Sequence, residues 1–85
     1  MKVADGKISR PIRDMMESDG FGRVIFKVAD FRQKFNTRTA ALGNRGRHGF
    51  DIYTKAYGEN EIHVIRRGGE DLPAITVDLS EFAEG

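Results

Sequence analysis

The 85-residue sequence contains no cysteine and only two prolines. Without thiols, neither a disulfide framework nor a thiolate zinc site can hold the fold together, so a small hydrophobic core must do so. No run approaches the roughly 18 apolar residues that a membrane-spanning helix needs, and the N-terminal sequence MKVADGKISR lacks the apolar segment of a secretion signal. We therefore expect one small, soluble, cytoplasmic protein.

Motifs for catalysis or metal binding are also missing. His48 and His63 are the only histidines, so a metal site would need carboxylates from distant parts of the chain. Ser9 has the position of a helix cap, while Ser18 and Ser80 have no neighbouring base that would activate them as nucleophiles. The glycine-rich segment GNRGRHG lacks both a preceding strand and a following Lys-Ser or Lys-Thr, so it does not match a nucleotide-binding loop. We expect a non-enzymatic protein with no metal and no cofactor.

Charge is distributed unevenly although the formal net charge is only +1. Residues 1–67 contain all 14 lysines and arginines and eight acidic residues, whereas residues 68–85 contain five acids and no base. The change occurs at RRGGEDLP, residues 66–73, whose two glycines and proline are typical of a hinge. We therefore predict a compact domain over residues 1–67, followed by an acidic C-terminal tail over residues 68–85.

The tail has two possible structures. Its apolar residues Ile75, Val77 and Leu79 alternate with Thr76 and Asp78, which is the pattern of a strand. Such a strand could join the edge of a sheet in its own chain or in a partner, and residues 72–82 could then support self-association. Alternatively, the tail is an acidic arm that folds over the basic part of the chain and competes with DNA.

The first helix is predicted to begin at Ser9. This residue is a good N-cap, and Pro11 is tolerated in the first turn of a helix. Ile12, Met15 and Met16 recur at spacings of three and four, so they form one apolar face that we expect to pack in the core.

Three segments have the alternating pattern of strands. Val24, Phe26 and Val28 alternate with polar or exposed positions in GRVIFKV. The segments FDIYTKAY and EIHVIRR also alternate, and the short sequence GEN joins them. The latter pair predicts a β-hairpin.

Between the first strand and the hairpin lies a basic helical region. Asp30 is expected to cap a short helix, and Asn36 suits a turn before a second helix at about residues 37–48, which Gly49 ends. No acid occurs from Phe31 to Phe50. A helical wheel predicts that one side of the second helix faces the core and contains Thr39, Leu42, Gly43 and Gly46. The opposite side is expected to face solvent and contains Thr37, Arg38, Ala41, Asn44, Arg45 and His48.

This order of elements resembles the winged helix-turn-helix family. The resemblance covers about residues 8–67 and depends on the segments DFRQKFNTRTAALGNRGRHGF and DIYTKAYGENEIHVIRR. The Arg- and Gly-rich second helix and the hairpin ending in VIRR are similar to the small winged-helix proteins of bacteriophages. The resemblance implies an α+β fold with a helix, a strand, two helices and a hairpin. The second helix of the pair would lie in the DNA major groove, and the hairpin would form a wing.

From this resemblance we expect a double-stranded DNA-binding protein that regulates transcription. The helix at about residues 37–48 presents side chains that can bond to base edges and phosphates. The expected groove contacts are Arg38, Asn44, Arg45 and His48, and the expected phosphate contacts are Thr37, Arg47, Lys55 and Arg67.

Other functions are compatible with the same residues. A phage-type protein could use a winged-helix scaffold to bind and inhibit a host or partner protein, which the low net charge and the patterned acidic tail favour. The segment NRGRHG could instead be a flexible loop that binds RNA or the DNA minor groove. Arg38 and Arg45 could also belong to an ordinary solvated helix face, although such a face normally carries charges of both signs.

Overall fold

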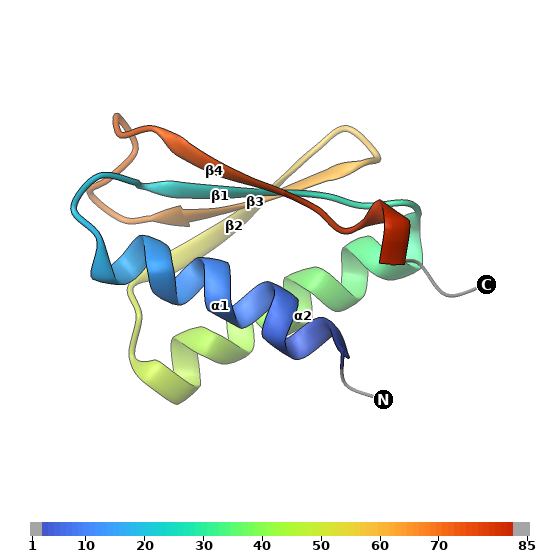
Figure 1. The fold of residues 1–85 in the computed structure, drawn as a ribbon, viewed down its shortest axis with the longest axis horizontal. Coiled ribbons are helices and arrows are strands. Elements are labelled where there is room, and N and C mark those ends of the chain that lie inside the picture. Colours follow the sequence, from blue (N-terminus) through green and yellow to red (C-terminus); the bar gives the residue numbers. More distant parts are fainter. Residues whose placement is uncertain (1–2, 83–85) are drawn as a thin grey trace.

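The protein is a two-layer α+β structure in a computed structural model that describes residues 3–82, with side chains placed for residues 6–81. Four strands form one sheet in the order β2-β3-β1-β4, in which β1 and β4 are parallel and the other pairs are antiparallel. Both helices cover the same face of this sheet (Figure 1). In chain order the elements are α1 (Val3–Glu17), β1 (Arg23–Lys27), α2 (Phe31–His48), β2 (Ile52–Tyr57), β3 (Glu61–Arg66), β4 (Ala74–Asp78) and the 3₁₀ turn η1 (Ser80–Phe82).

The hydrophobic core lies between the helices and the sheet. Helix α1 supplies residues at spacings of four and three, and the strands supply alternate residues, as expected for a sheet with one face against helices. Each large side chain that is fully buried contributes roughly 1.5 to 3 kcal/mol to stability. The buried apolar residues of this cluster are Ile8, Ile12, Met15, Val24, Phe26, Val28, Ala41, Ile52, Ile62, Val64 and Leu79.

Helix α1 begins earlier than the sequence indicated. It starts at Val3, because Ile8 is buried one turn before Ile12 and extends the apolar stripe toward the N-terminus. Ser9 is therefore an internal residue of the helix and not its N-cap. Its hydroxyl oxygen accepts a hydrogen bond from the side-chain amide of Asn44 at 3.1 Å, which links the two helices. Pro11 also lies inside the helix, where the sequence predicted it in the first turn.

Helix α2 is one continuous element of 18 residues, so the predicted helix-turn-helix is wrong. The ends were predicted correctly: the Asp30 carboxylate accepts a hydrogen bond from the Gln33 backbone N–H at 2.9 Å, and Gly49 is left-handed with φ of 70°. Asn36, the predicted turn, is instead an exposed helical residue. No glycine or proline interrupts the helix before Gly43, and its buried stripe continues past Asn36, so nothing forces a turn there.

The predicted hairpin forms, but it is not a wing. Strands β2 and β3 pair antiparallel, with Thr54 opposite Val64. The other edge of β3 pairs with β1, where Val64 lies opposite Val24. The hairpin is thus half of the central sheet, and its Ile52, Ile62 and Val64 side chains form part of the core. The α+β class is correct, but the winged helix-turn-helix topology is wrong.

The acidic C-terminal part of the chain contributes the fourth strand. β4 pairs in parallel with β1, and Leu79 just after it is buried in the core. The expectation of an edge strand within the same chain is therefore confirmed, and residues 74–78 do not form an acidic arm. The boundary expected near Arg67 falls in the connection from β3 to β4. Self-association through residues 72–82 stays a prediction.

The connection from β3 to β4 must cross the end of β1, because β1 lies between those two strands. Two glycine backbones meet at this crossing: a Cβ atom on Gly22 would lie 1.7 Å from the carbonyl oxygen of Gly69. The Arg66 N–H donates to the Gly22 carbonyl at 2.8 Å, and the Gly22 N–H donates to the Pro73 carbonyl at 3.1 Å. Gly22 is therefore required for close backbone approach.

The crossing leads to a prediction about stability. We expect Gly22→Ala to lower the melting temperature strongly, because overpacking against rigid backbone costs roughly 1 to 3 kcal/mol or more. Gly46→Ala is the matched control, since a Cβ there meets nothing within 4 Å. This control should stabilise the protein by up to about 1 kcal/mol, the difference in helix propensity between alanine and glycine. Thermal melts of both variants test the prediction. A Gly22→Ala protein as stable as the wild type would contradict the close backbone contact between Gly22 and Gly69.

Candidate functional site

The eight predicted DNA contacts do not form one surface, because α2 is rotated relative to the expected wheel. Thr37 and Asn44 are each only 1% exposed, and they face the core together with Ala41. Gly43 and Gly46, which were assigned to the core, are exposed. The assignment of the two helix faces is therefore wrong, and neither Thr37 nor Asn44 is accessible to a groove or a phosphate.

A polar residue can occupy the core side of α2 because its amide nitrogen forms two hydrogen bonds there. The Asn44 amide nitrogen donates to the Ser9 hydroxyl and to the Ala40 carbonyl, at 3.1 Å and 3.0 Å. Within the described residues, its side-chain oxygen has no hydrogen-bond partner. Two bonds from one amide offset much of the cost of burying it. The partner residue on α1 could not be identified from the pattern of α2 alone.

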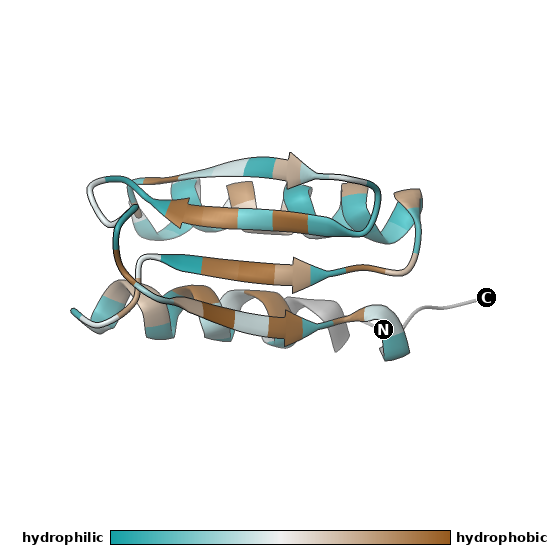
Figure 2. Ribbon diagram, turned by 90° about the horizontal axis from the view of Figure 1, so that it is seen from above, coloured by the Kyte–Doolittle hydropathy of each residue, from teal (hydrophilic) through white to brown (hydrophobic). Residues whose placement is uncertain are grey.

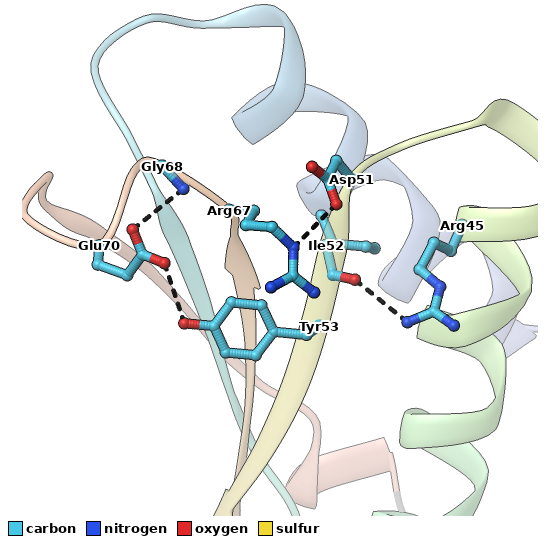
Figure 3. A network of polar contacts seen from close by, with 7 residues as sticks. All are labelled: Arg45, Asp51, Ile52, Tyr53, Arg67, Gly68 and Glu70. Atoms are coloured by element: carbon cyan, nitrogen blue, oxygen red, sulfur yellow. Dashed lines mark hydrogen bonds and ion pairs between the residues drawn. The ribbon is translucent and has the colours of Figure 1, made fainter.

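Arg38 and Arg45 lie along the side of α2 that faces β2, together with Lys34. All three donate hydrogen bonds to β2 or to the turn that follows it. β2 is an edge strand, and two of these cations bond to carbonyl oxygens near its two ends, where a carboxylate could not donate. The basic side chains at these three positions therefore have a structural role. The bonds are Lys34 Nζ to the Gly58 carbonyl at 3.1 Å, Arg38 Nε to Thr54 Oγ1 at 3.3 Å, and Arg45 NH1 to the Ile52 carbonyl at 3.4 Å (Figure 3 shows the last).

Arg47 and His48 are exposed in the last turn of α2. A cation at a helix C-terminus interacts favourably with the helix dipole, so Arg47 also stabilises the helix. The His48 ring stacks on Phe50, with ring centroids 5.1 Å apart.

The remaining two predicted contacts, Lys55 and Arg67, lie on the opposite side of the molecule. Seen from above, the sheet is in front and both helices are behind it, so no described element covers this face (Figure 2). We call it the open sheet face. It consists of the strand residues that alternate with the core positions: Arg23, Ile25, Lys27, Tyr53, Lys55, Tyr57, Glu61, His63, Ile65, Ala74, Thr76 and Asp78.

An aromatic and cationic cluster lies on the open sheet face around Tyr57. Its ring packs against the ring of His63, with centroids 4.0 Å apart. The Lys55 ammonium lies 5.5 Å from the ring centroid, and the Arg23 guanidinium lies 5.9 Å from it. Both distances are within the range of cation–π attraction. Tyr57 nevertheless remains 38% exposed, so its ring is presented at the surface with cations beside it.

His63 fixes the position of Arg23 beneath this ring. The imidazole is 6% exposed, and its Nδ1 atom lies 3.0 Å from an Arg23 guanidinium nitrogen. Because a guanidinium can only donate, Nδ1 must accept this hydrogen bond. In the neutral ring the proton is then on Nε2, which donates to the Glu61 carboxylate at 2.9 Å. The buried histidine therefore connects a cation and a carboxylate on two strands.

A second cluster surrounds Tyr53 (Figure 3). The Arg67 guanidinium lies 4.9 Å from the ring centroid, and its Nε donates to Asp51 at 3.0 Å. The Tyr53 hydroxyl donates to one oxygen of Glu70 at 3.1 Å, while the other oxygen accepts the Gly68 N–H at 3.0 Å. This network anchors the connection between β3 and β4 to the first residues of β2.

The pKa values of both network residues are shifted from their ordinary values. The pKa of Glu70 lies below its ordinary value because its carboxylate accepts its own backbone N–H, with smaller contributions from Tyr53 and Gly68. The pKa of Tyr53 is raised, first by desolvation and then by its hydrogen bond to Glu70. The network is therefore formed with Glu70 ionised and Tyr53 protonated.

The aromatic residues of this face were not among the predicted site residues. Tyr53, Lys55 and Tyr57 alternate along one strand, so all three point to the same side of the sheet. This Tyr-x-Lys-x-Tyr spacing is visible in the sequence. It was overlooked because the hairpin was interpreted as a wing, in which only the basic residues were considered.

The described residues contain no group of three or more His, Asp or Glu side chains that could hold a metal ion. In the same part of the chain, no helix is long and apolar enough to cross a membrane. No protein-family model, curated protein or solved structure matches the chain. The function is therefore inferred from the geometry of the surfaces alone.

The Glu70 network predicts a specific acid sensitivity. Because the folded-state pKa of Glu70 is lowered, its stabilising contribution is present above the unfolded-state pKa of about 4.3 and is lost as the pH falls through the folded value. Wild-type melting temperature should therefore fall more between pH 5 and pH 3 than that of Glu70→Gln, whose side chain does not titrate. Other acids titrate in both proteins, so equal pH dependence would show that the network does not stabilise the fold.

Proposed function

We propose that the protein binds single-stranded nucleic acid on the open sheet face, and that its function is binding rather than catalysis. One observation carries this proposal: the exposed ring of Tyr57 lies beside the side chains of Arg23 and Lys55 on an uncovered sheet. Nucleobases stack on aromatic rings, and the phosphates that join them bind lysine and arginine. The two kinds of contact are adjacent on this face.

The charges of this face also favour an anionic ligand. Among the described residues, Arg23 and Lys55 form no ion pair with a carboxylate. Glu61 is bound by His63, and Glu70 is bound by Tyr53. Arg23 and Lys55 are thus available to phosphates, while those two acids are held by partners of their own.

The spacing of the two tyrosines suits separate bases. Tyr53 and Tyr57 are four residues apart on one strand, which corresponds to roughly 13 Å at about 3.3 Å per residue. Lys55 lies between them on the same side. Aromatic, basic and aromatic side chains therefore alternate along the strand in the way that bases and phosphates alternate along a nucleic-acid chain.

The shape of this surface favours a single strand over a duplex. Four strands at about 4.8 Å spacing make a face wider than the roughly 12 Å major groove, which admits one helix or a two-stranded ribbon. The bases of a duplex are stacked on each other and are not available to the tyrosine rings. An unpaired strand can lie across the sheet with its bases turned toward them.

The proposal predicts that nucleic-acid binding depends on the aromatic ring of Tyr57 and not on its hydroxyl group. We expect Tyr57→Ala to weaken binding of a labelled 20-nucleotide oligothymidylate by roughly 5- to 100-fold, corresponding to about 1 to 3 kcal/mol for one stacked base. The matched control is Tyr57→Phe, which keeps the ring and should bind as the wild type does. Fluorescence anisotropy in low salt measures both.

A second control separates this face from α2. Arg47→Ala removes an exposed cation on the helical side and should leave oligothymidylate binding unchanged. Binding to a 20-base-pair duplex that weakens with Arg47→Ala, but not with Tyr57→Ala, would show that α2 is the nucleic-acid surface and that the open sheet face is not.

The salt dependence of the affinity for oligothymidylate should indicate how many phosphates the protein contacts. If Arg23, Lys55 and Arg67 each bind one phosphate, the logarithm of affinity should fall with the logarithm of salt concentration at a slope of about −2, at roughly 0.7 per contact. Titrations at several potassium chloride concentrations measure the slope. Lys55→Gln should make it shallower by about 0.7, and a slope unaffected by this substitution would exclude Lys55 from the interface.

A further inference from the structure

The exposed side of α2 is unusual for a helix on a protein surface. We call it the outer stripe, and it lies opposite the buried residues of the same helix. Phe31 is 75% exposed and Phe35 is 54% exposed, and they are one turn apart. Leaving two phenylalanines in water forgoes the stabilisation that burial would give. The outer stripe consists of Phe31, Phe35, Thr39, Leu42, Gly43 and Gly46.

The packing of the protein itself does not explain the glycines of this stripe. A Cβ atom on Gly46 would meet nothing within 4 Å, and one on Gly43 would meet only the side chain of Arg47 at 3.9 Å. Both positions are helical, where alanine is the more favourable residue. The stripe therefore combines exposed rings at one end with two exposed glycines at the other.

Charge around the stripe identifies the chemistry of its occupant. Arg32 and Arg38 are three residues before and after Phe35, so they flank its ring on either side. Arg47 lies four residues after Gly43, beside the glycine end. Helix α2 contains no acid at all. A second copy of the chain would bring the same cations face to face, and an acidic occupant would pair with them.

The geometry points to a docking site on the outer stripe of α2 for an acidic amphipathic helix of a partner protein. The apolar side of that helix would cover Phe31 and Phe35, and its backbone would approach α2 closely over Gly43 and Gly46. Its aspartates and glutamates would face Arg32, Arg38 and Arg47. This site is on the opposite side of the molecule from the open sheet face and does not depend on it.

The site can be tested on the intact protein with synthetic peptides. The probe is a labelled 20-residue peptide with leucine at positions i, i+3, i+4 and i+7 and glutamate or alanine elsewhere. A second peptide has lysine in place of every glutamate. Fluorescence anisotropy should show binding of the acidic peptide and at least tenfold weaker binding of the basic one. Equal binding of both peptides, or binding of neither, would overturn the proposal.

Variants of the stripe identify the contact surface. Phe35→Ala should weaken binding of the acidic peptide at least tenfold, while the melting temperature changes little because the side chain is exposed. Phe35→Leu keeps an apolar side chain and should retain most of the affinity. Gly46→Leu should block the peptide without unfolding the protein, since the space outside the helix is free. Peptide binding that survives both Phe35→Ala and Gly46→Leu would overturn the proposal.

Two further measurements distinguish an acidic helix from other possible occupants of the outer stripe. Sedimentation should show a monomer, and a dimer that disappears with Phe35→Ala would assign the stripe to a second copy instead. Vesicles of phosphatidylcholine with phosphatidylserine should not bind the protein. Vesicle binding that is lost with Phe35→Ala would assign the outer stripe to a membrane surface.

Tyr57→Ala should leave peptide binding unchanged, and Phe35→Ala should leave oligothymidylate binding unchanged, so either proposal can fail alone.

Discussion

The close contact between the backbones at Gly22 and Gly69 is the constraint on which the rest of this fold depends. The two backbone segments can pass at this distance because neither glycine has a side chain. The segment after β3 can therefore reach the far side of β1. β4 then pairs with β1, and Leu79 completes the core. The same connection carries Glu70, which holds Tyr53 in place. A local close approach thus allows the connection that places β4 beside β1 and that carries Glu70 to Tyr53.

The local elements with clear boundaries could be predicted from sequence periodicity and from the residues at their ends. The strand around Phe26, the hairpin, the Asp30 cap and the Gly49 end were all predicted, because each depends on residues within a few positions of one another. The order of strands was not predictable in this way. It depends on pairing between Arg23–Lys27 and two segments that lie much later in the chain. Element order alone therefore suggested a topology that the sheet pairing excludes.

The rotation of α2 explains why the predicted assignment of its two faces was wrong. Glycines were assigned to the core because they allow close packing, yet Ala41 already allows it, and Asn44 is buried through a bond to Ser9 on another helix. A helical wheel contains no information about such a bond. Arg38 and Arg45 were predicted to contact a DNA groove, and in the structure they and Lys34 donate hydrogen bonds to β2 or to the turn that follows it. Of the eight predicted contacts, Lys55 and Arg67 lie on the face that we propose to bind nucleic acid.

The covering of β2 by cations from α2 limits how molecules of this protein could join through their sheets. Hydrogen bonds to the carbonyls of Ile52 and Gly58 occupy acceptors near the two ends of β2, whereas β4 at the other edge meets no further strand among the described residues. Strand addition is therefore less favourable at the β2 edge than at the β4 edge.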